Sequence, residues 1–155
     1  MQPTQSEIVH KGKFNLDHMG KVIYTAKTHT TGGRLGGAAR SDDGILDVKF
    51  ATPGTSREGT NPEQMFAAGW SACFISAMGG IALKNKTSLP KDAAVDAEVD
   101  LMLLGGVDYL LQARLNVSLP GMDREAALKL IEDSSHVCPY SKAIEGNVEV
   151  SYNLV

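Results

Sequence analysis

Residues 60–84 read TNPEQMFAAGWSACFISAMGGIALK, and residues 65–83 within this segment contain no charged side chain. An uncharged segment of this length is close to the length that spans a bilayer. However, much of it is Ala, Gly and Ser, and the segments on either side have strand patterns. A helix that is apolar nearly all round is also typical of a protein core. We therefore expect a fully buried central helix and no membrane partner.

The start of this helix carries one of two capping patterns. In the first, Thr60 is the cap and Glu63 occupies position N3. In the second, Asn61 is the cap, Pro62 occupies N1 and Gln64 occupies N3. Further along the helix, small residues recur on one face, where another backbone can approach closely; they are Gly69, Ala72, Ser76, Gly79 and Gly80.

Segments with strand periodicity flank the helix on both sides. Apolar and polar residues alternate in five segments, around 22–26, 46–50, 95–103, 109–117 and 148–154. Such alternation predicts one buried and one solvated face, as in antiparallel sheets. A second helix is expected to begin after a cap at Asp123 and to continue to about Val137, because Pro139 ends it. The order predicts a single α+β domain over residues 21–155, preceded by an N-terminal arm over residues 1–20.

Composition excludes several classes of function. The chain has 155 residues and a formal net charge of −3 without a compensating Lys/Arg cluster, so we expect no nucleic-acid partner. Residues 1–20 lack the apolar region of a secretory signal, which predicts a cytoplasmic protein. Because the cytosol keeps thiols reduced, the two cysteines, Cys73 and Cys138, are either inert buried thiols or a redox couple.

The two cysteines occupy helical positions from which they could meet. Cys73 lies inside the central helix, where the simplest interpretation is a small apolar core residue. Cys138 lies at the end of the second helix, on its inward face. If the two helices pack side by side, the thiols can meet within the Cα separation of about 4.4–6.8 Å that a disulfide requires.

A buried apolar thiol has a raised pKa, so catalysis by Cys73 requires a nearby cation. The candidate is Arg34 in the glycine-rich segment TGGRLGG (31–37), which can fold tightly and aim the side chain inward. The alternative is a surface loop with a solvated arginine. Glu63 either complements the helix dipole or fixes the Arg34 guanidinium through a carboxylate pair. Ten helical residues place Glu63 about 15 Å from Cys73, which also makes a site shared between two chains an option.

Other kinds of site are disfavoured by spacing. The glycines of 31–37 fit neither a dinucleotide-binding fingerprint nor a phosphate-binding loop. His136 is near Cys138 but lies off the buried face, so we interpret it as an exposed residue of the helix end. The remaining histidines, His10, His18 and His29, show no ligand spacing with either cysteine, and we expect no metal site.

Four segments, in the same order and at similar spacing, resemble the signature segments of the OsmC/Ohr superfamily. They are Thr31-Gly32-Gly33-Arg34, Gly59-Thr60-Asn61-Pro62-Glu63-Gln64, Ser71-Ala72-Cys73-Phe74 and Val137-Cys138-Pro139-Tyr140-Ser141. The Cys-Pro-Tyr-Ser segment and the stretch Ser-Asp-Asp-Gly-Ile-Leu-Asp-Val from Ser41 resemble its organic hydroperoxide resistance (Ohr) branch in particular. The resemblance runs from about Lys21 to Val155.

The resemblance implies antiparallel sheets wrapped around the central helix, in an intertwined homodimer with two active sites at the interface. It implies a peroxidase without cofactor or metal that reduces organic and fatty-acid hydroperoxides. By position, Cys73 matches the peroxidatic cysteine and Cys138 the resolving cysteine. Arg34 and Glu63 match the polar pair that activates the thiol. An external dithiol, dihydrolipoamide or a lipoylated protein, is the implied reductant.

The chain departs from the family pattern in ways that concern the substrate pocket. Trp70 stands where the family more often has Tyr, residues 1–20 extend beyond the usual start, and Gly79-Gly80 loosen a stretch usually filled with larger residues. Phe66, Trp70 and Phe74 are close in sequence to Cys73. We expect these three to line an apolar pocket that favours organic peroxides over hydrogen peroxide.

Three other functions remain open. An OsmC-branch peroxidase of broader substrate range would be distinguished by its relative rates on alkyl and hydrogen peroxide. A non-catalytic module that binds a hydrophobic ligand would consume peroxide only stoichiometrically. A redox sensor would pass its disulfide to a partner protein.

Overall fold

The computed structural model describes residue 12 and residues 20–155. Over this part of the chain the elements are β1 (Thr28–Thr31), β2 (Ala38–Ser41), β3 (Asp47–Lys49), α1 (Pro62–Lys84), β4 (Ala94–Leu104), β5 (Asp108–Ser118), α2 (Arg124–Val137), α3 (Pro139–Ile144) and β6 (Glu149–Leu154). The strands form two three-stranded sheets, ordered β1-β2-β3 and β4-β5-β6. Apart from residues 12 and 20, the predicted arm over 1–20 lies outside the described residues.

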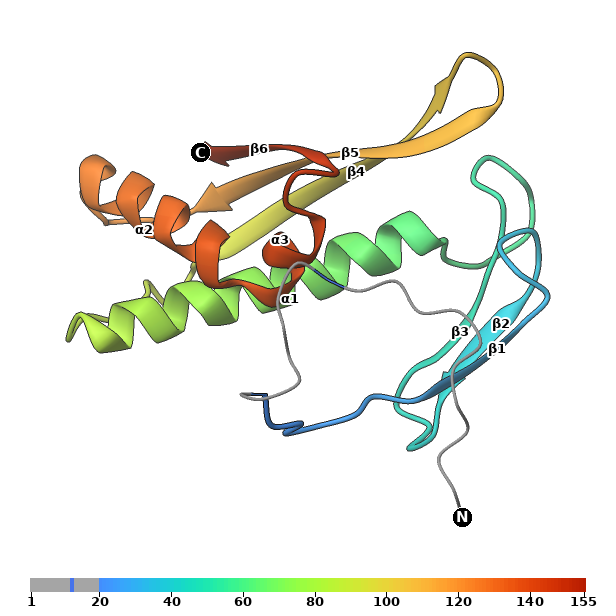
Figure 1. Cartoon of the computed structure of the whole chain (residues 1–155), viewed down its shortest axis with the longest axis horizontal. Coiled ribbons are helices and arrows are strands. Elements are labelled where there is room, and N and C mark those ends of the chain that lie inside the picture. The colour runs from blue at the N-terminus through green and yellow to red at the C-terminus, as the bar shows by residue number, and fades with distance from the viewer. Residues whose placement is uncertain (1–11, 13–19) are drawn as a thin grey trace.

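The larger sheet and the helices share one hydrophobic core. Figure 1 shows α1 running beneath β4 and β5, with α2 and α3 beside it. Alternate residues of β5 face these helices, so Ala113, Leu115 and Val117 are almost fully buried. They pack with Trp70 and Phe74 of α1, and with apolar side chains of α2. The expected strand periodicity of 95–103, 109–117 and 148–154 is therefore confirmed.

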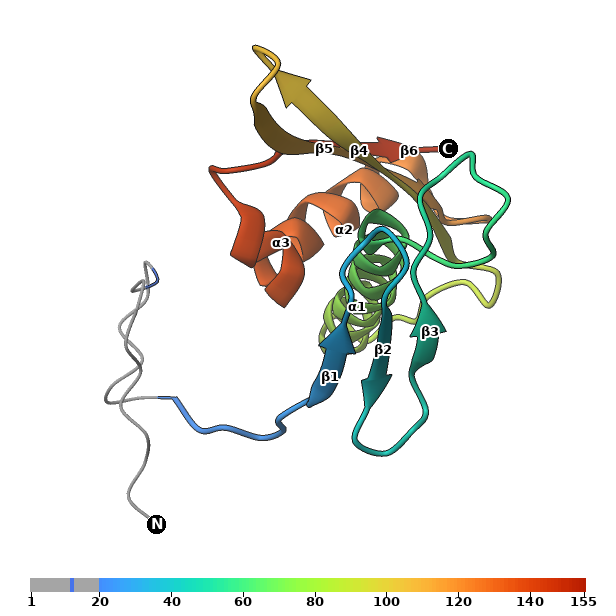
Figure 2. The same cartoon turned by 90° about the vertical axis from the view of Figure 1, so that its right-hand side faces the viewer.

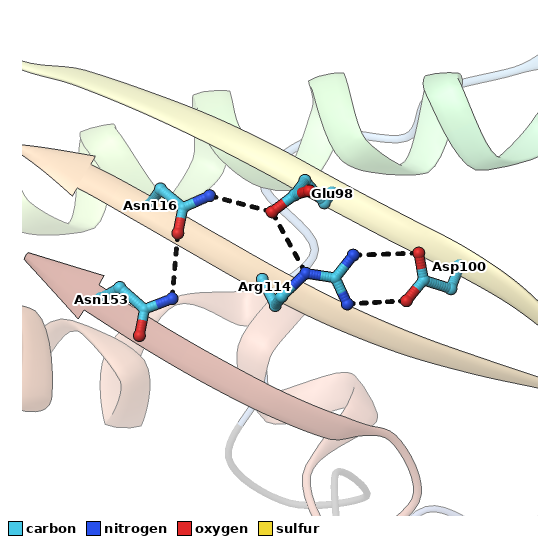
Figure 3. A network of polar contacts seen from close by, with 5 residues as sticks. All are labelled: Glu98, Asp100, Arg114, Asn116 and Asn153. Atoms are coloured by element: carbon cyan, nitrogen blue, oxygen red, sulfur yellow. Dashed lines mark hydrogen bonds and ion pairs between the residues drawn. The ribbon is translucent and has the colours of Figure 1, made fainter. Parts of the chain in front are cut away.

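The opposite face of this sheet is polar and carries a network of side-chain contacts (Figure 3). Arg114 of β5 forms a two-pronged ion pair with Asp100 of β4, at 2.7 and 3.0 Å, and donates through Nε to Glu98 at 3.1 Å. Asn116 donates to the same Glu98 carboxylate at 3.1 Å, and Asn153 of β6 donates to Asn116 at 2.9 Å. Among the described residues, then, helices cover only one face of the sheet.

Both predicted helices form, and their caps can be assigned. The Asn61 side chain accepts the backbone N–H of Gln64 at 2.8 Å and Pro62 is the first helical residue, so Asn61 rather than Thr60 is the cap of α1. Asp123 caps α2 by accepting the N–H of Ala126 at 3.1 Å. Pro139 ends α2 as expected, but it also starts the short helix α3, which the sequence analysis missed. A proline is favourable at the first helical position because it has no N–H to leave unpaired.

The strand predictions need three corrections. Strand β6 pairs with β5 in parallel, so the larger sheet is not wholly antiparallel; α2 and α3 form the crossover that a parallel pair requires. Strand β2 was not predicted, because Ala38–Ser41 is too short for a clear alternation. Residues 22–26 form no strand within the chain, and Val22, Ile23 and Tyr24 are 77–93% exposed.

Helix α1 is less buried in the single chain than expected. Its fully buried residues are Trp70, Phe74, Met78 and Ala82. The helix is long and apolar enough to cross a bilayer by length and composition, but β4, α2 and α3 pack against it, as around a core helix. The remaining face is uncovered: Ala68, Ala72, Ser76 and Gly80, four residues apart, are exposed.

The smaller sheet stands apart from this core, at the N-terminal end of α1 (Figures 1 and 2). Its strands pair antiparallel, with Thr31 opposite Ala38 at the end of the β1–β2 hairpin. None of its residues belongs to the core cluster around Trp70. Beyond the chain connection, an isolated bridge between Phe50 and Thr60 joins this region to the start of α1.

Candidate active site

The fold brings the two cysteines together from segments 65 positions apart in the sequence. Cys73 lies in the middle of α1, and Cys138 is the residue between α2 and α3. Both thiols are free, and the Cys138 thiol lies within hydrogen-bonding range of the Cys73 thiol. The two helices do pack side by side, which is the condition under which the sequence allowed the thiols to meet.

The two thiols differ in exposure. Cys138 is fully buried, whereas Cys73 is partly exposed. Burial raises the pKa of Cys73, and the neighbouring Cys138 thiol raises it further. Opposing this, the backbone N–H of Tyr140 donates to the Cys73 sulfur and lowers its pKa. The N–H is available because it belongs to the first turn of α3, where backbone donors have no partner within the helix.

An open groove of about 510 Å³ leads to the Cys73 thiol. Its floor is the partly uncovered face of α1, and its wall is the junction of α2 and α3. The lining residues are Cys73, Ser76, Ala77, Gly80, Ile81, Lys84, Val137 and Pro139. A small molecule that enters this groove meets Cys73 directly but cannot touch Cys138.

Arg34 and Glu63 form the ion pair that the sequence analysis anticipated. The Arg34 Nη2 atom lies 2.5 Å from a Glu63 carboxylate oxygen. The loop before β2 makes this possible: Gly32 and Gly33 have φ values of 71° and 65°, which favour glycine. A Cβ atom on Gly37 would lie 2.0 Å from the carbonyl oxygen of Thr31. The tight turn therefore holds Arg34 at the start of α1.

Within one chain, this ion pair is not brought to the thiol. The groups that shift the pKa of Cys73 are its buried surroundings, Tyr140 and Cys138, and Arg34 is not among them. Glu63 lies ten residues before Cys73 on the same regular helix, a rise of about 15 Å. Within one chain, the thiol pair of Cys73 and Cys138 and the ion pair of Arg34 and Glu63 are thus both formed, but in separate places.

The expected substrate pocket is wrong for two of its three residues. Trp70 and Phe74 expose no surface, so they are core residues and a substrate cannot touch them. Both side chains pack in the core with residues of β5 and α2, whereas the groove is lined by residues 73, 76, 77, 80, 81 and 84 of α1. Phe66 is partly buried and its ring lies 5.5 Å from Trp70 and 6.1 Å from Tyr140. His136 is exposed at the end of α2.

Two further residues that shape the site, Arg57 and Ser141, were not predicted from the sequence. Arg57 donates to the carbonyl of Leu35 at 3.3 Å and so braces the loop that carries Arg34. Ser141, one turn after Cys138, accepts hydrogen bonds from Trp70 and Tyr152. Ser141 belongs to the Val137–Ser141 motif, but a serine in a short helix gives no sequence signal for its distant partners.

Three comparisons relate the chain to known proteins. Residues 54–153 match the family described as OsmC-like protein. An organic hydroperoxide resistance protein of Xanthomonas axonopodis pv. citri is 42% identical over 139 residues, covering 86% of this chain and 96% of that protein. An uncharacterized protein of Acinetobacter baylyi is 44% identical over 138 residues, covering 87% of this chain and 95% of the other.

The fold is also shared with solved structures. The organic hydroperoxide resistance protein OhrB of Bacillus subtilis matches with a TM-score of 0.80 and 37% identity, over 86% of this chain and 100% of that chain. A protein of Legionella pneumophila described as an organic hydroperoxide resistance protein matches equally well, with a TM-score of 0.80 over 86% of this chain. The family match contains Glu63, Cys73 and Cys138, whereas Arg34 precedes its first residue.

Proposed function

The chain belongs to the OsmC-like protein family, in its organic hydroperoxide resistance branch, and we propose that it is a thiol peroxidase that reduces organic hydroperoxides to alcohols. The observation that carries the proposal is the pairing of a partly exposed thiol, Cys73, with a fully buried one, Cys138, while both are reduced. A peroxide in the groove reaches Cys73 first, and the product of that reaction forms beside Cys138. The difference in exposure supports the proposal that Cys73 attacks the peroxide and Cys138 resolves the sulfenic acid.

The cycle consists of three steps of thiol chemistry. The Cys73 thiolate attacks one peroxide oxygen and the O–O bond breaks; the leaving alkoxide takes a proton and departs as an alcohol, while Cys73 keeps the oxygen as a sulfenic acid. The Cys138 sulfur then attacks the sulfenic sulfur, an S–S bond forms, and the hydroxyl leaves with the thiol proton as water. An external dithiol, dihydrolipoamide or a lipoylated protein, reduces the disulfide by exchange. No metal or cofactor takes part in these steps.

Activation of Cys73 requires a cation that the chain's own loop does not deliver. We place that cation in a homodimer, where the ion pair of Arg34 and Glu63 on one protomer meets the thiol of the other. A guanidinium near the thiol favours the thiolate, and its donors also stabilise charge on the leaving oxygen. The ion pair is preassembled in each chain, so only the approach of the second chain is needed.

Uncovered apolar surface supports the homodimer. The exposed row of small residues on α1 allows close approach of a second helix. The end of the β4–β5 hairpin extends beyond the rest of the chain (Figure 1) and carries apolar side chains that are 43–86% exposed. They are Leu101, Met102, Leu103, Leu104, Val107, Tyr109 and Leu110. Contiguous apolar surface of this kind marks interaction sites. Residues 22–24, with a strand pattern and no partner strand, fit the same interface.

Peroxide consumption in the presence of dihydrolipoamide tests the proposed function. The wild-type chain is expected to turn over an alkyl hydroperoxide such as cumene hydroperoxide, and faster than hydrogen peroxide. Cys73→Ser is expected to abolish consumption, whereas Cys138→Ser forms the sulfenic acid once and then stalls. Full turnover by Cys73→Ser, or a single stoichiometric reaction by the wild type with ample reductant, would overturn the proposal.

A further inference from the structure

Ser141 joins three elements through one buried hydroxyl. The side chain lies in α3 and is 4% exposed. Its Oγ accepts the indole N–H of Trp70 in α1 at 2.9 Å and the hydroxyl of Tyr152 in β6 at 3.2 Å. A buried indole N–H needs an acceptor, and within the described structure Ser141 supplies it. This hydroxyl therefore links the helix of Cys73 to the helix that begins after Cys138.

The spacing of these residues relates the link to the thiols. Trp70 lies one turn before Cys73 on α1, and Ser141 lies one turn after Cys138 at the start of α3. The hydrogen bond from Trp70 to Ser141 and the contact between the thiols are thus two links between the same pair of segments, one turn apart. The hydrogen bond between Trp70 and Ser141 therefore fixes how far apart the two segments lie at Cys73 and Cys138.

Tyr152 completes the arrangement from the sheet. Its ring stacks on Phe74, the residue after Cys73, with centroids 5.4 Å apart and an interplanar angle of 25°. Burial raises the pKa of Tyr152, and its proximity to Cys138 raises it further. Tyr152 therefore packs next to the cysteine-bearing segments on their core side, and its hydroxyl donates to Ser141. In this way β6 supports the thiol pair.

We propose that Ser141 is a positioning residue for the resolving step, with Trp70 and Tyr152 as its two anchors. The inference rests on the proposed peroxidase function and concerns only its second step. In that step the Cys138 sulfur displaces the hydroxyl of the Cys73 sulfenic acid, and water leaves. Without the link through Ser141, α3 moves relative to α1 and Cys138 loses its reach. The sulfenic acid then persists in the groove, where a second peroxide oxidises it irreversibly to the sulfinic acid.

Single-turnover experiments on the full-length reduced protein separate the two steps. With excess cumene hydroperoxide and acid quenching, mass spectrometry follows the sulfenic acid, the disulfide and the sulfinic acid. For Ser141→Ala we expect the rate of sulfenic acid formation to stay within about twofold of wild type. Disulfide formation is expected to slow by on the order of tenfold to a hundredfold, as for other small misplacements of reacting groups. The more slowly the disulfide forms, the more sulfinic acid we expect to accumulate at Cys73.

Two further variants control for folding. Tyr152→Phe removes only one of the two hydrogen bonds, and we expect a smaller slowing of disulfide formation. Ser134→Ala is the matched control, because Ser134 is also a buried serine and its hydroxyl donates to the carbonyl oxygen of Leu130 in its own helix, at 2.6 Å. This variant should resolve at the wild-type rate, which would exclude a general effect of losing a buried hydroxyl.

The outcomes distinguish the two proposals. If wild-type protein forms no sulfenic acid at Cys73, the peroxidase function fails and the role of Ser141 fails with it. If the wild type forms the disulfide, and Ser141→Ala and Tyr152→Phe form it as fast as the wild type does, only the positioning role is overturned. Equal slowing by Ser134→Ala would also overturn it, as would slowing of both steps by Ser141→Ala.

Discussion

The two parts of this chain that carry candidate catalytic residues are held in place very differently. The thiols lie between α1, α2 and α3, against a continuous core that includes the buried face of the larger sheet. Arg34 lies on a loop of the smaller sheet, which contributes nothing to that core and meets α1 through an ion pair. The thiol pair is therefore complete in one chain, whereas the charged pair is assembled but remote. This difference is the observation behind our proposal that a second chain supplies the activating charge.

Removing the largest buried side chain tests the core of the thiol region. For Trp70→Ala we expect a loss of about 3–5 kcal/mol in unfolding free energy, because a large cavity forms and the core collapses only partly. Ile45→Ala, on the smaller-sheet side and 86% exposed, should change stability by less than about 0.5 kcal/mol. Urea unfolding at one fixed protein concentration measures both. A loss of similar size for Ile45→Ala would contradict the exposed position of this side chain outside any core.

Removing the Arg34 charge, on the loop of the smaller sheet, should have the opposite effect: activity falls while stability hardly changes. Arg34→Ala should lower kcat/KM for cumene hydroperoxide by on the order of 10²–10³, as expected for a lost stabilising donor. The unfolding free energy should hardly change, since the Arg34 side chain is 42% exposed and exposed ion pairs contribute little. Arg40→Ala is the matched control in the same sheet: Arg40 is 67% exposed, and its contact with Asp47 is long, at 3.8 Å. An Arg34→Ala variant that is fully active but unstable would reverse the comparison.

The pH dependence of thiol reactivity sharpens the comparison. In a separated chain burial raises the pKa of Cys73, so its thiolate fraction is small at neutral pH and alkylation accelerates as pH rises. In the proposed dimer, we expect the guanidinium of Arg34 of the partner subunit to lower this pKa. We expect Ala68→Arg, on the exposed face of α1, to separate the chains and to cut the alkylation rate at pH 7 by about tenfold per unit of pKa difference.

Alkylation by iodoacetamide between pH 5 and 10, in the Cys138→Ser background, measures this difference. Sedimentation of the same samples verifies the separation of the chains. Ala126→Arg, an exposed alanine of α2, provides the control and should stay dimeric. Identical pH profiles for separated and dimeric chains would contradict a cation supplied by the partner.

The smallest effect is expected on the polar face of the larger sheet. Arg114 lowers the pKa of Glu98 and Asp100, so these carboxylates stabilise the fold above their ordinary pKa of about 4 and lose that contribution as pH falls through their lowered values. Arg114→Ala should therefore be slightly less stable at neutral pH and lose less stability on acidification. Urea midpoints at pH 3–7 report this, with Gln112→Ala as a neighbouring control. No change in acid sensitivity would show that the network in Figure 3 is screened by solvent.

Much of the fold could be predicted because local patterns and the observed packing agree. The uncharged helix, the cap at Asp123 and the alternation along β4 and β5 all have causes within a few residues of sequence. For α1 the sequence left two caps open, and the structure selects Asn61 over Thr60. The parallel pairing of β6 could not be read in this way, since alternation has the same period in both kinds of sheet. The absent strand at 22–26 had the right pattern but no neighbouring strand to pair with in the chain.

The candidate site was less predictable than the fold: its two residue pairs could be predicted, but its pocket and Ser141 could not. The facing of Cys73 and Cys138 follows from the inward faces of two helices, and the contact between Arg34 and Glu63 follows from opposite charge. The pocket residues Trp70 and Phe74 were misassigned because closeness in sequence to Cys73 does not show which side chains the neighbouring strands and helices cover. Ser141 acts through partners 71 and 11 positions away, and no local pattern indicates such contacts.

Mixed dimers test most directly whether the site is divided between two chains. Differently tagged Cys73→Ser and Arg34→Ala chains, co-expressed and purified through both tags, contain one intact site only if Arg34 acts on the other protomer. We predict about half of the wild-type kcat for this mixed dimer. Wild-type chains paired with a Cys73→Ser/Arg34→Ala double variant should be nearly inactive. The reverse pattern, an inactive first pair and a half-active second pair, would show that each chain activates its own thiol and would contradict the account.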